Sequence, residues 1–278
     1  MIKNILFPVD FSPSCVEMAA YVKRAAEIFR AQVTLVHVCD LASHDGFELY
    51  ARPASEIAQD HRDLALGKLR DFLHSEFPAG SSPRVLLAGP AADGIADIAK
   101  KNNIDLIIMP THAGRFRRMF LGSTTAKVLD VVECPVLTAQ HAANFAPRPL
   151  NHRIWICAIG LSADSERVLR YAYLASLAAG AKLSVIHVAP SQKTESSNQT
   201  VSEQQVAGQI AELQSRIDSN APLSIVTGPI KETLLEAVRQ ASADVLVVGR
   251  CPDTGVLGHL NDLTYALVRD SACPVVSV

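Results

Sequence analysis

Short apolar segments alternate along the chain with longer segments in which apolar residues recur at helical spacing. In the first half, five apolar runs rich in β-branched residues cover residues 4–9, 32–38, 84–89, 105–109 and 135–139. Between them, helices are predicted to begin near Ser14, Ser55, Ala91 and Gly122. The runs are apolar throughout, as expected of strands that are covered on both faces. This alternation is typical of βαβ units on a parallel sheet.

The first predicted helix has both a start signal and a buried stripe. Ser14-x-x-Glu17 has the form of a capping box, in which two side chains pair with backbone N–H groups at a helix start. Apolar residues then recur on one face, at Met18, Tyr21, Val22, Ala25, Ile28 and Phe29. We therefore expect a helix that begins at about Ser14 and packs this stripe against the sheet.

The whole pattern occurs twice. The segment "DLIIMP" at Asp105 matches "DVLVVG" at Asp244, and "ECPVLTA" at Glu133 matches "ACPVVSV" at Ala272, each 139 residues apart. Upstream, Asp10 matches Gly160 at a spacing of 150 residues, so the first copy carries an insertion of 11 residues. Duplication of a whole domain explains these spacings better than a solenoid, whose units run to about 20–50 residues.

The sequence predicts an α/β protein of two tandem Rossmann-like domains of flavodoxin size. Each domain is expected to hold a five-stranded, mainly parallel sheet flanked by helices. The first domain is assigned to residues 1–140, a linker to residues 141–152 and the second domain to residues 153–278. Pro147 and Pro149 suit an extended linker.

Composition and charge exclude several classes of protein. The chain has 278 residues, is 49% hydrophobic, and carries a formal charge of −2 with a pI near 6.5. It therefore lacks the overall basic field that gathers nucleic acid or anionic membranes. No run of about 18 uncharged apolar residues and no secretory leader pattern is present. We expect a soluble, cytoplasmic protein with no nucleic-acid or membrane partner.

The cysteines and two histidines are expected to be structural. Six cysteines are spread along the chain without a C-x-x-C pair, which speaks against a zinc site or a disulfide framework. Cys15 differs because the dipole of the first helix can lower a thiol pKa there, although a buried thiol is the favoured interpretation; a redox role is left open. His37 and His187 fall at equivalent positions in core strands, so interior imidazoles are expected.

Several motifs, in this order, resemble the universal stress protein family. They are "PVDFS" at Pro8, a Gly-Pro helix entry at Gly89, "DLIIMPTH" ahead of a Gly-Ser helix entry, and a closing "CPVL". The likeness covers nearly the whole chain twice and resembles a tandem-type member. It implies a Rossmann-like sheet which, in one branch of the family, binds ATP through a G-x2-G-x9-G-[S/T] loop.

The resemblance carries three parts of that site onto the first repeat. Asp10 matches the acidic residue that contacts the ribose or metal region, and Val38 lies near the adenine-facing end of the second strand. Gly122 and Ser123 match the phosphate-binding pair, and Thr124 follows them at the helix start. The implied cofactor is ATP or ADP, with Mg²⁺.

The intervening loop departs from the family motif. Pro110 and Ala113 stand where the first two glycines are expected, and eight residues instead of nine separate Ala113 from Gly122. Gly114 could restore flexibility one position later. His112 is expected at the C-terminal end of the fourth strand, where α/β folds bind ligands. Whether it contacts the nucleotide itself or a residue that holds the nucleotide is left open.

Three arginines lie in the same loop. Arg115, Arg117 and Arg118 could neutralise a triphosphate and offset the lost backbone donors, with Arg117 counted in the candidate site. The alternative is a solvated basic loop without a ligand.

The second repeat has lost the features that the resemblance assigns to the site. Asp262 stands opposite Ser123, and Gly160 stands opposite Asp10. A carboxylate in place of the phosphate-binding hydroxyl would repel a nucleotide. The second domain is therefore predicted not to bind one in the family manner.

Two functions follow from these expectations. The first is a stress-response regulator that binds ATP or ADP through the first domain, with the second as scaffold. The alternative is a nucleotide-independent scaffold for unknown protein partners, with both sites vestigial. No catalytic residue or metal ligand set is assigned, so at most slow ATP hydrolysis is expected.

Homodimers of this family resemble two sheets joined antiparallel through their last strands. By this resemblance, residues 136–139 are predicted to pair with residues 275–278, which would build a pseudo-dimer inside one chain. A further homodimer is left open.

Overall fold

The computed structural model describes residues 2–39, 54–111, 121–139, 152–189, 202–250 and 262–278. The chain divides into two compact units. One consists largely of residues 2–134, and the other of residues 135–140 and 144–278. The fold is mixed α/β in both, as predicted, and the strands are almost all parallel.

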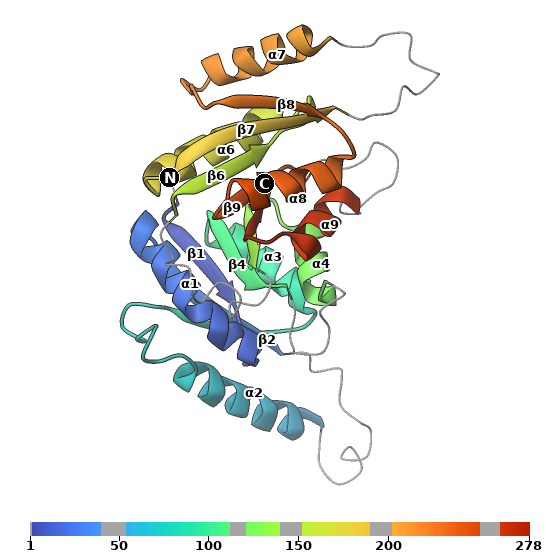
Figure 1. The fold of residues 1–278 in the computed structure, drawn as a ribbon. Helices are drawn as coiled ribbons and strands as arrows, with labels where there is room; N and C mark the ends of the chain where they lie inside the picture. The colour runs from blue at the N-terminus through green and yellow to red at the C-terminus, as the bar shows by residue number, and fades with distance from the viewer. Residues whose placement is uncertain (1, 40–53, 112–120, 140–151, 190–201, 251–261) are drawn as a thin grey trace. The chain divides into compact units, whose positions relative to one another are not determined.

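The first unit contains a parallel sheet of the order β3-β2-β1-β4. Its strands are β1 (Asn4–Pro8), β2 (Gln32–Cys39), β3 (Arg84–Ala88) and β4 (Leu106–Pro110). Its helices are α1 (Pro13–Phe29), α2 (Ala54–Asp71), α3 (Ala91–Lys101) and α4 (Ser123–Val131). Because βαβ crossovers are right-handed, α1 and α2 cover one face, and α3 and α4 pack together on the other (Figure 1).

The second unit has the sheet order β5-β10-β9-β6-β7-β8. Its strands are β5 (Val136–Ala139), β6 (Ile154–Ala158), β7 (Lys182–Ala189), β8 (Leu223–Thr227), β9 (Val245–Val248) and β10 (Val275–Ser277). Its helices are α6 (Ser165–Ala178), α7 (Glu203–Ser215), α8 (Ile230–Gln240) and α9 (Asp262–Asp270). Among these pairs, β5 and β10 run antiparallel and the others are parallel.

The pairing of the two closing strands confirms the prediction from the sequence. Leu137 lies opposite Val276, and Val136 lies opposite Ser277. The Thr138 hydroxyl donates a hydrogen bond to the Val275 carbonyl at 3.3 Å. Both strands are buried, so each covers an edge that would otherwise expose unpaired backbone groups.

The start of α1 differs from the sequence prediction. The N-cap is Ser12, whose hydroxyl accepts a hydrogen bond from the Cys15 N–H, and Pro13 occupies the first turn. The expected capping box at Ser14 and Glu17 was therefore wrong by two residues. Proline explains the shift, because its fixed φ and missing N–H suit the first helical position.

One aspartate in each repeat ties two strands together. Asp105, just before β4, accepts hydrogen bonds from the N–H groups of Lys3 and Asn4 at 2.7 and 2.9 Å. Asp244, just before β9, accepts the equivalent bonds from Arg153 and Ile154 at the same distances. The repeated acidic residue ahead of the apolar run is thus structural, since it caps the start of the neighbouring strand.

Candidate functional site

The order of the first sheet creates a switch point between β1 and β4. The chain leaves β1 toward β2 on one side and later returns to β4 on the other, so the loops after β1 and β4 diverge. Ligands of open α/β sheets bind in the crevice at this point, beyond the carboxyl ends of the strands. Asp10 follows β1, and the start of α4 follows β4. The two predicted parts of the site therefore flank the switch point.

Asp10 is exposed and its carboxylate is oriented by α1. Its Oδ1 atom accepts a hydrogen bond from the Ser12 N–H at 2.9 Å and lies 3.1 Å from the Cys15 Sγ atom, which donates to it. One carboxylate oxygen is thereby held toward the helix. The second oxygen has no such contact among the described residues.

Cys15 is buried and serves as a donor in this arrangement. Burial, reinforced by the negative charge of Asp10, raises the pKa of the Cys15 thiol from 9.0 to about 12. The helix dipole does not lower the pKa as the sequence had left open, because desolvation of the thiolate is the larger effect. Cys15 is therefore a neutral hydrogen-bond donor near pH 7.

Two hydrogen bonds fix the ends of the loop between β4 and α4. The Gly122 N–H donates to the Thr111 carbonyl at 2.8 Å, and the Thr125 hydroxyl donates to the Pro110 carbonyl at 3.1 Å. Thr111 and Thr125 were not among the predicted site residues. Their hydrogen bonds join residues that are distant in the sequence, so the sequence does not show them. Thr264, the equivalent of Thr125 in the second repeat, was the one signal that could have indicated Thr125.

The first residues of α4 are exposed. Gly122 is the N-cap and has no side chain to bond the first-turn N–H groups. Ser123 and Thr124 follow at the helix start and are exposed. Backbone N–H groups at such a start attract anions. The other predicted residues of this loop, His112, Gly114 and Arg117, lie outside the described residues.

Val38 and His37 lie near the end of β2. Val38 is half-buried, and a Cβ added to Gly94 of α3 would lie 3.3 Å from its Cγ2 atom. The His37 Nδ1 atom lies 2.7 Å from the Val9 carbonyl, which fits an Nδ1–H donor. Phe11 packs against this imidazole at 4.3 Å between ring centroids and adds an aromatic surface beside Asp10 that the sequence reading missed.

The second repeat keeps the framework but changes the chemistry. The Thr264 hydroxyl donates to the Gly249 carbonyl at 3.1 Å, as Thr125 does to Pro110. Ser165 replaces Cys15, and its hydroxyl donates to the Gly160 carbonyl at 2.6 Å. His187 lies 2.9 Å from the Ile159 carbonyl, which repeats the His37 contact.

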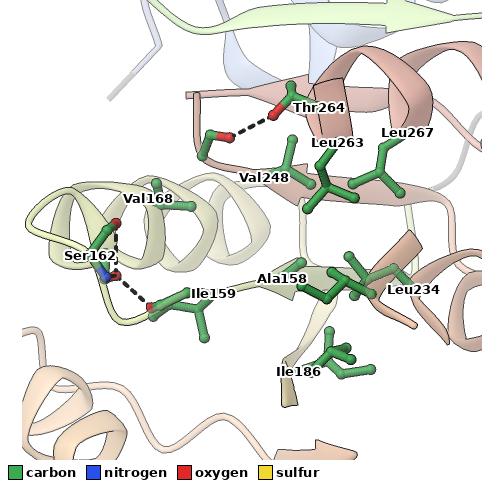
Figure 2. Close-up of a pocket in the computed structure, with 15 residues that line it drawn as sticks. Ala158, Ile159, Ser162, Val168, Ile186, Leu234, Val248, Leu263, Thr264 and Leu267 are labelled. Carbon is green, nitrogen blue, oxygen red and sulfur yellow. Dashed lines mark hydrogen bonds between the residues drawn. The ribbon is translucent and has the colours of Figure 1, made fainter. Parts of the chain in front are cut away.

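A cavity of about 200 Å³ opens at the switch point of the second sheet, between β6 and β9. Figure 2 shows apolar side chains from β6, β7, β9, α6, α8 and α9 around it, among them Ile159, Val168 and Leu267. Sequence reasoning treated this site only as degenerate and missed the cavity. The available signal was the pair of glycines, Gly160 and Gly249, where the first repeat has Asp10 and Pro110.

Among the residues that the structure describes, no three of the types His, Cys, Asp and Glu gather in a way that could hold a metal ion. Within the same ranges, no helix is both long and apolar enough to cross a membrane.

The molecule is thus a tandem pair of Rossmann-like α/β domains, and the sheet of each has a switch point. The chain belongs to the universal stress protein family, whose model matches it twice, over residues 1–140 and 152–278. It is therefore a tandem universal stress protein.

Individual relatives agree with this assignment. A universal stress protein of Thermus aquaticus is 30% identical over 141 residues, which cover 50% of this chain and 100% of the relative. One of Methanocaldococcus jannaschii is 28% identical over 148 residues, covering 50% of this chain and 82% of the relative. The crystal structure of a universal stress protein from Archaeoglobus fulgidus is similar to the whole chain, with a TM-score of 0.71 and 19% identity. The match covers 99% of this chain and 97% of the relative. At this level of identity, the similarity shows a shared fold.

Proposed function

We propose that this protein acts in the stress response by binding ATP or ADP, with Mg²⁺, through its first repeat. Membership of the universal stress protein family supports the stress-response role. The observation that carries the nucleotide proposal is the placement of Asp10 and the uncapped start of α4 on either side of one switch point. One end of the crevice offers a carboxylate to a ribose or Mg²⁺, and the other offers backbone N–H groups to phosphates.

The remaining residues fit the same ligand. Val38, whose side chain lies beside Gly94 of α3, presents apolar surface near the end of β2, where the resemblance places adenine. Arg117, with its neighbours Arg115 and Arg118, is proposed to neutralise the phosphates. No general base is assigned, so the proposed activity is that of a sensor with at most slow hydrolysis.

One observation favours the second candidate, a scaffold that acts without nucleotide. Pro110 stands where the family motif has its first glycine, and it lies in β4 with its carbonyl bonded to Thr125. Proline provides no N–H for a phosphate. In this alternative, the loop is structural and the protein surfaces bind partners.

A charge introduced at the start of α4 separates the two candidates. We expect Ser123→Asp, which copies Asp262 of the second repeat, to weaken MgATP binding about tenfold or more in calorimetric titration, because like charges meet at the phosphate position. The variant should fold normally, since an acidic residue in a first helical turn is favourable. Ser81→Asp, in an exposed turn before β3 at the opposite sheet edge, is the matched control and should bind like the unaltered protein.

The same titration decides against the proposal if the unaltered protein shows no binding at millimolar MgATP. The scaffold function would then stand. Binding that Ser123→Asp leaves unchanged would place the nucleotide elsewhere.

A further inference from the structure

Among the described residues, the cavity of the second repeat is lined by neutral side chains. The 15 of them that line it include none with a charged side chain. Its walls are formed by buried apolar residues from several elements, namely Ile159, Val168, Ile186, Leu234, Val248 and Leu267. Such a surface favours an apolar ligand, because its burial removes apolar area from water on both sides.

The polar groups at the rim bond to one another. The Ser165 hydroxyl donates to the Gly160 carbonyl at 2.6 Å and accepts from the Ser162 N–H at 3.0 Å (Figure 2). The Thr264 hydroxyl donates to the Gly249 carbonyl at 3.1 Å. To donate a hydrogen bond to a phosphate or a sugar, these two hydroxyls would have to break their internal bonds. A strongly polar ligand therefore gains little here.

Two residues that line the cavity differ from their equivalents in the first repeat. Gly160 replaces Asp10, which removes a carboxylate from the rim. Gly249 replaces Pro110, and a Cβ at Gly249 would already lie 3.1 Å from the Val168 Cγ2 atom. Both glycines line the cavity just beyond the ends of β6 and β9, at positions where the first repeat has larger residues.

We propose that the second repeat binds a small, uncharged, apolar ring compound in this cavity, independently of any nucleotide in the first repeat. The volume sets the size of the ligand. About 200 Å³ is below the range of roughly 300–1,000 Å³ that is usual for drug-sized ligands. An apolar cavity of about 150 Å³ is enough to hold benzene. One substituted ring or two fused rings fit this space.

Fluorobenzene is a suitable probe, because its fluorine signal can be followed by NMR while it is titrated with the full-length protein. We expect saturable binding to the unaltered chain. Gly160 lines the cavity and is exposed, and a Cβ added there would meet no atom within 4 Å, so a larger side chain at this position fits at the rim without a clash. Gly160→Leu should weaken binding about tenfold or more, and Gly160→Val by a smaller factor.

The matched control is Gly208→Leu. Gly208 lies on the exposed side of α7 and has open space around it, so this variant adds the same side chain away from the cavity. It should bind fluorobenzene like the unaltered protein. Circular dichroism and the emission of Trp155, the one tryptophan of the chain, report whether each variant is folded. If Gly160→Leu does not fold, the smaller effect of Gly160→Val decides.

Three results would overturn the proposal. They are absence of saturable binding, equal binding by the folded Gly160 variants, and displacement of fluorobenzene by adenosine monophosphate at millimolar concentration. The last result would show that the cavity accepts a nucleotide. Because none of these outcomes depends on ATP binding at Ser123, they leave the proposed function of the first repeat to its own test.

Discussion

At the residue scale, the contact between Cys15 and Asp10 defines what each can do. The thiol orients one oxygen of the carboxylate, and the carboxylate in turn helps to keep the thiol protonated. Ser165 occupies the same position in the second repeat, where Gly160 replaces Asp10 and the hydroxyl bonds to the Gly160 carbonyl instead. Cys15 is thus paired with Asp10 in the first repeat, and Ser165 with Gly160 in the second.

Cys15 should be slow to react with iodoacetamide in the folded protein. The thiolate is the nucleophile, and with a pKa of about 12 only a fraction on the order of 10⁻⁴ is ionised near pH 8. The rate should keep rising with pH toward 12. Mass spectrometry of labelled peptides measures it, with half-buried Cys39 as the faster-reacting reference.

The raised pKa of Cys15 also makes the stability of the protein depend on pH. Because the pKa is higher in the folded state than in the unfolded state, the protonated thiol contributes to the free energy of unfolding below about pH 9. This contribution is lost as the pH rises to about 12. Labelling of Cys15 as fast as that of Cys39 at pH 8 would show that the thiol is neither buried nor bonded as described.

At the scale of elements, Arg84 joins α2 to β3. Its guanidinium donates hydrogen bonds to the carbonyls of Leu69, Phe72 and Phe77 at 2.7, 2.8 and 2.8 Å. These carbonyls lie at the end of α2 and in the turns that follow. Unpaired carbonyls at a helix end need such partners, so one side chain fixes how the segment returns to the sheet.

Arg84→Met should therefore destabilise the protein by about 2–4 kcal/mol, because three carbonyls lose a charged donor while the apolar stem is retained. Urea denaturation measures the change in the free energy of unfolding. Arg70→Met is the control, since the Arg70 side chain is 73% exposed and should contribute within about 0.5 kcal/mol. Equal stability of the two variants would mean that the Arg84 bonds contribute nothing.

The elements were predictable because their signals are local. The apolar runs and the stripe of α1 follow from side-chain periodicity, and the strand pairing of residues 136–139 with 275–278 followed from the family resemblance. The N-cap was misplaced because Pro13 outweighs the Ser14-Glu17 pattern. The cavity and the Asp10–Cys15 contact depend on side chains brought together by the sheet, and no single segment carries that information.

At the scale of the whole molecule, gene duplication has left two switch points of different character. The first has a carboxylate and an exposed helix start, and the second has two glycines and an apolar cavity. The closing strands of the two repeats pair antiparallel, while the wider pseudo-dimer and a further homodimer stay predictions. We therefore propose that one chain holds two unlike ligands, one in each repeat.

The number of nucleotides bound per chain shows whether only the first repeat binds ATP. Equilibrium dialysis of the full-length protein against labelled ATP with Mg²⁺ measures it. Because the phosphate-binding pair and the carboxylate occur only in the first repeat, we predict one nucleotide per chain, bound more weakly as salt screens the charged contacts. Two equivalent nucleotides per chain, or none at millimolar ATP, would contradict the account.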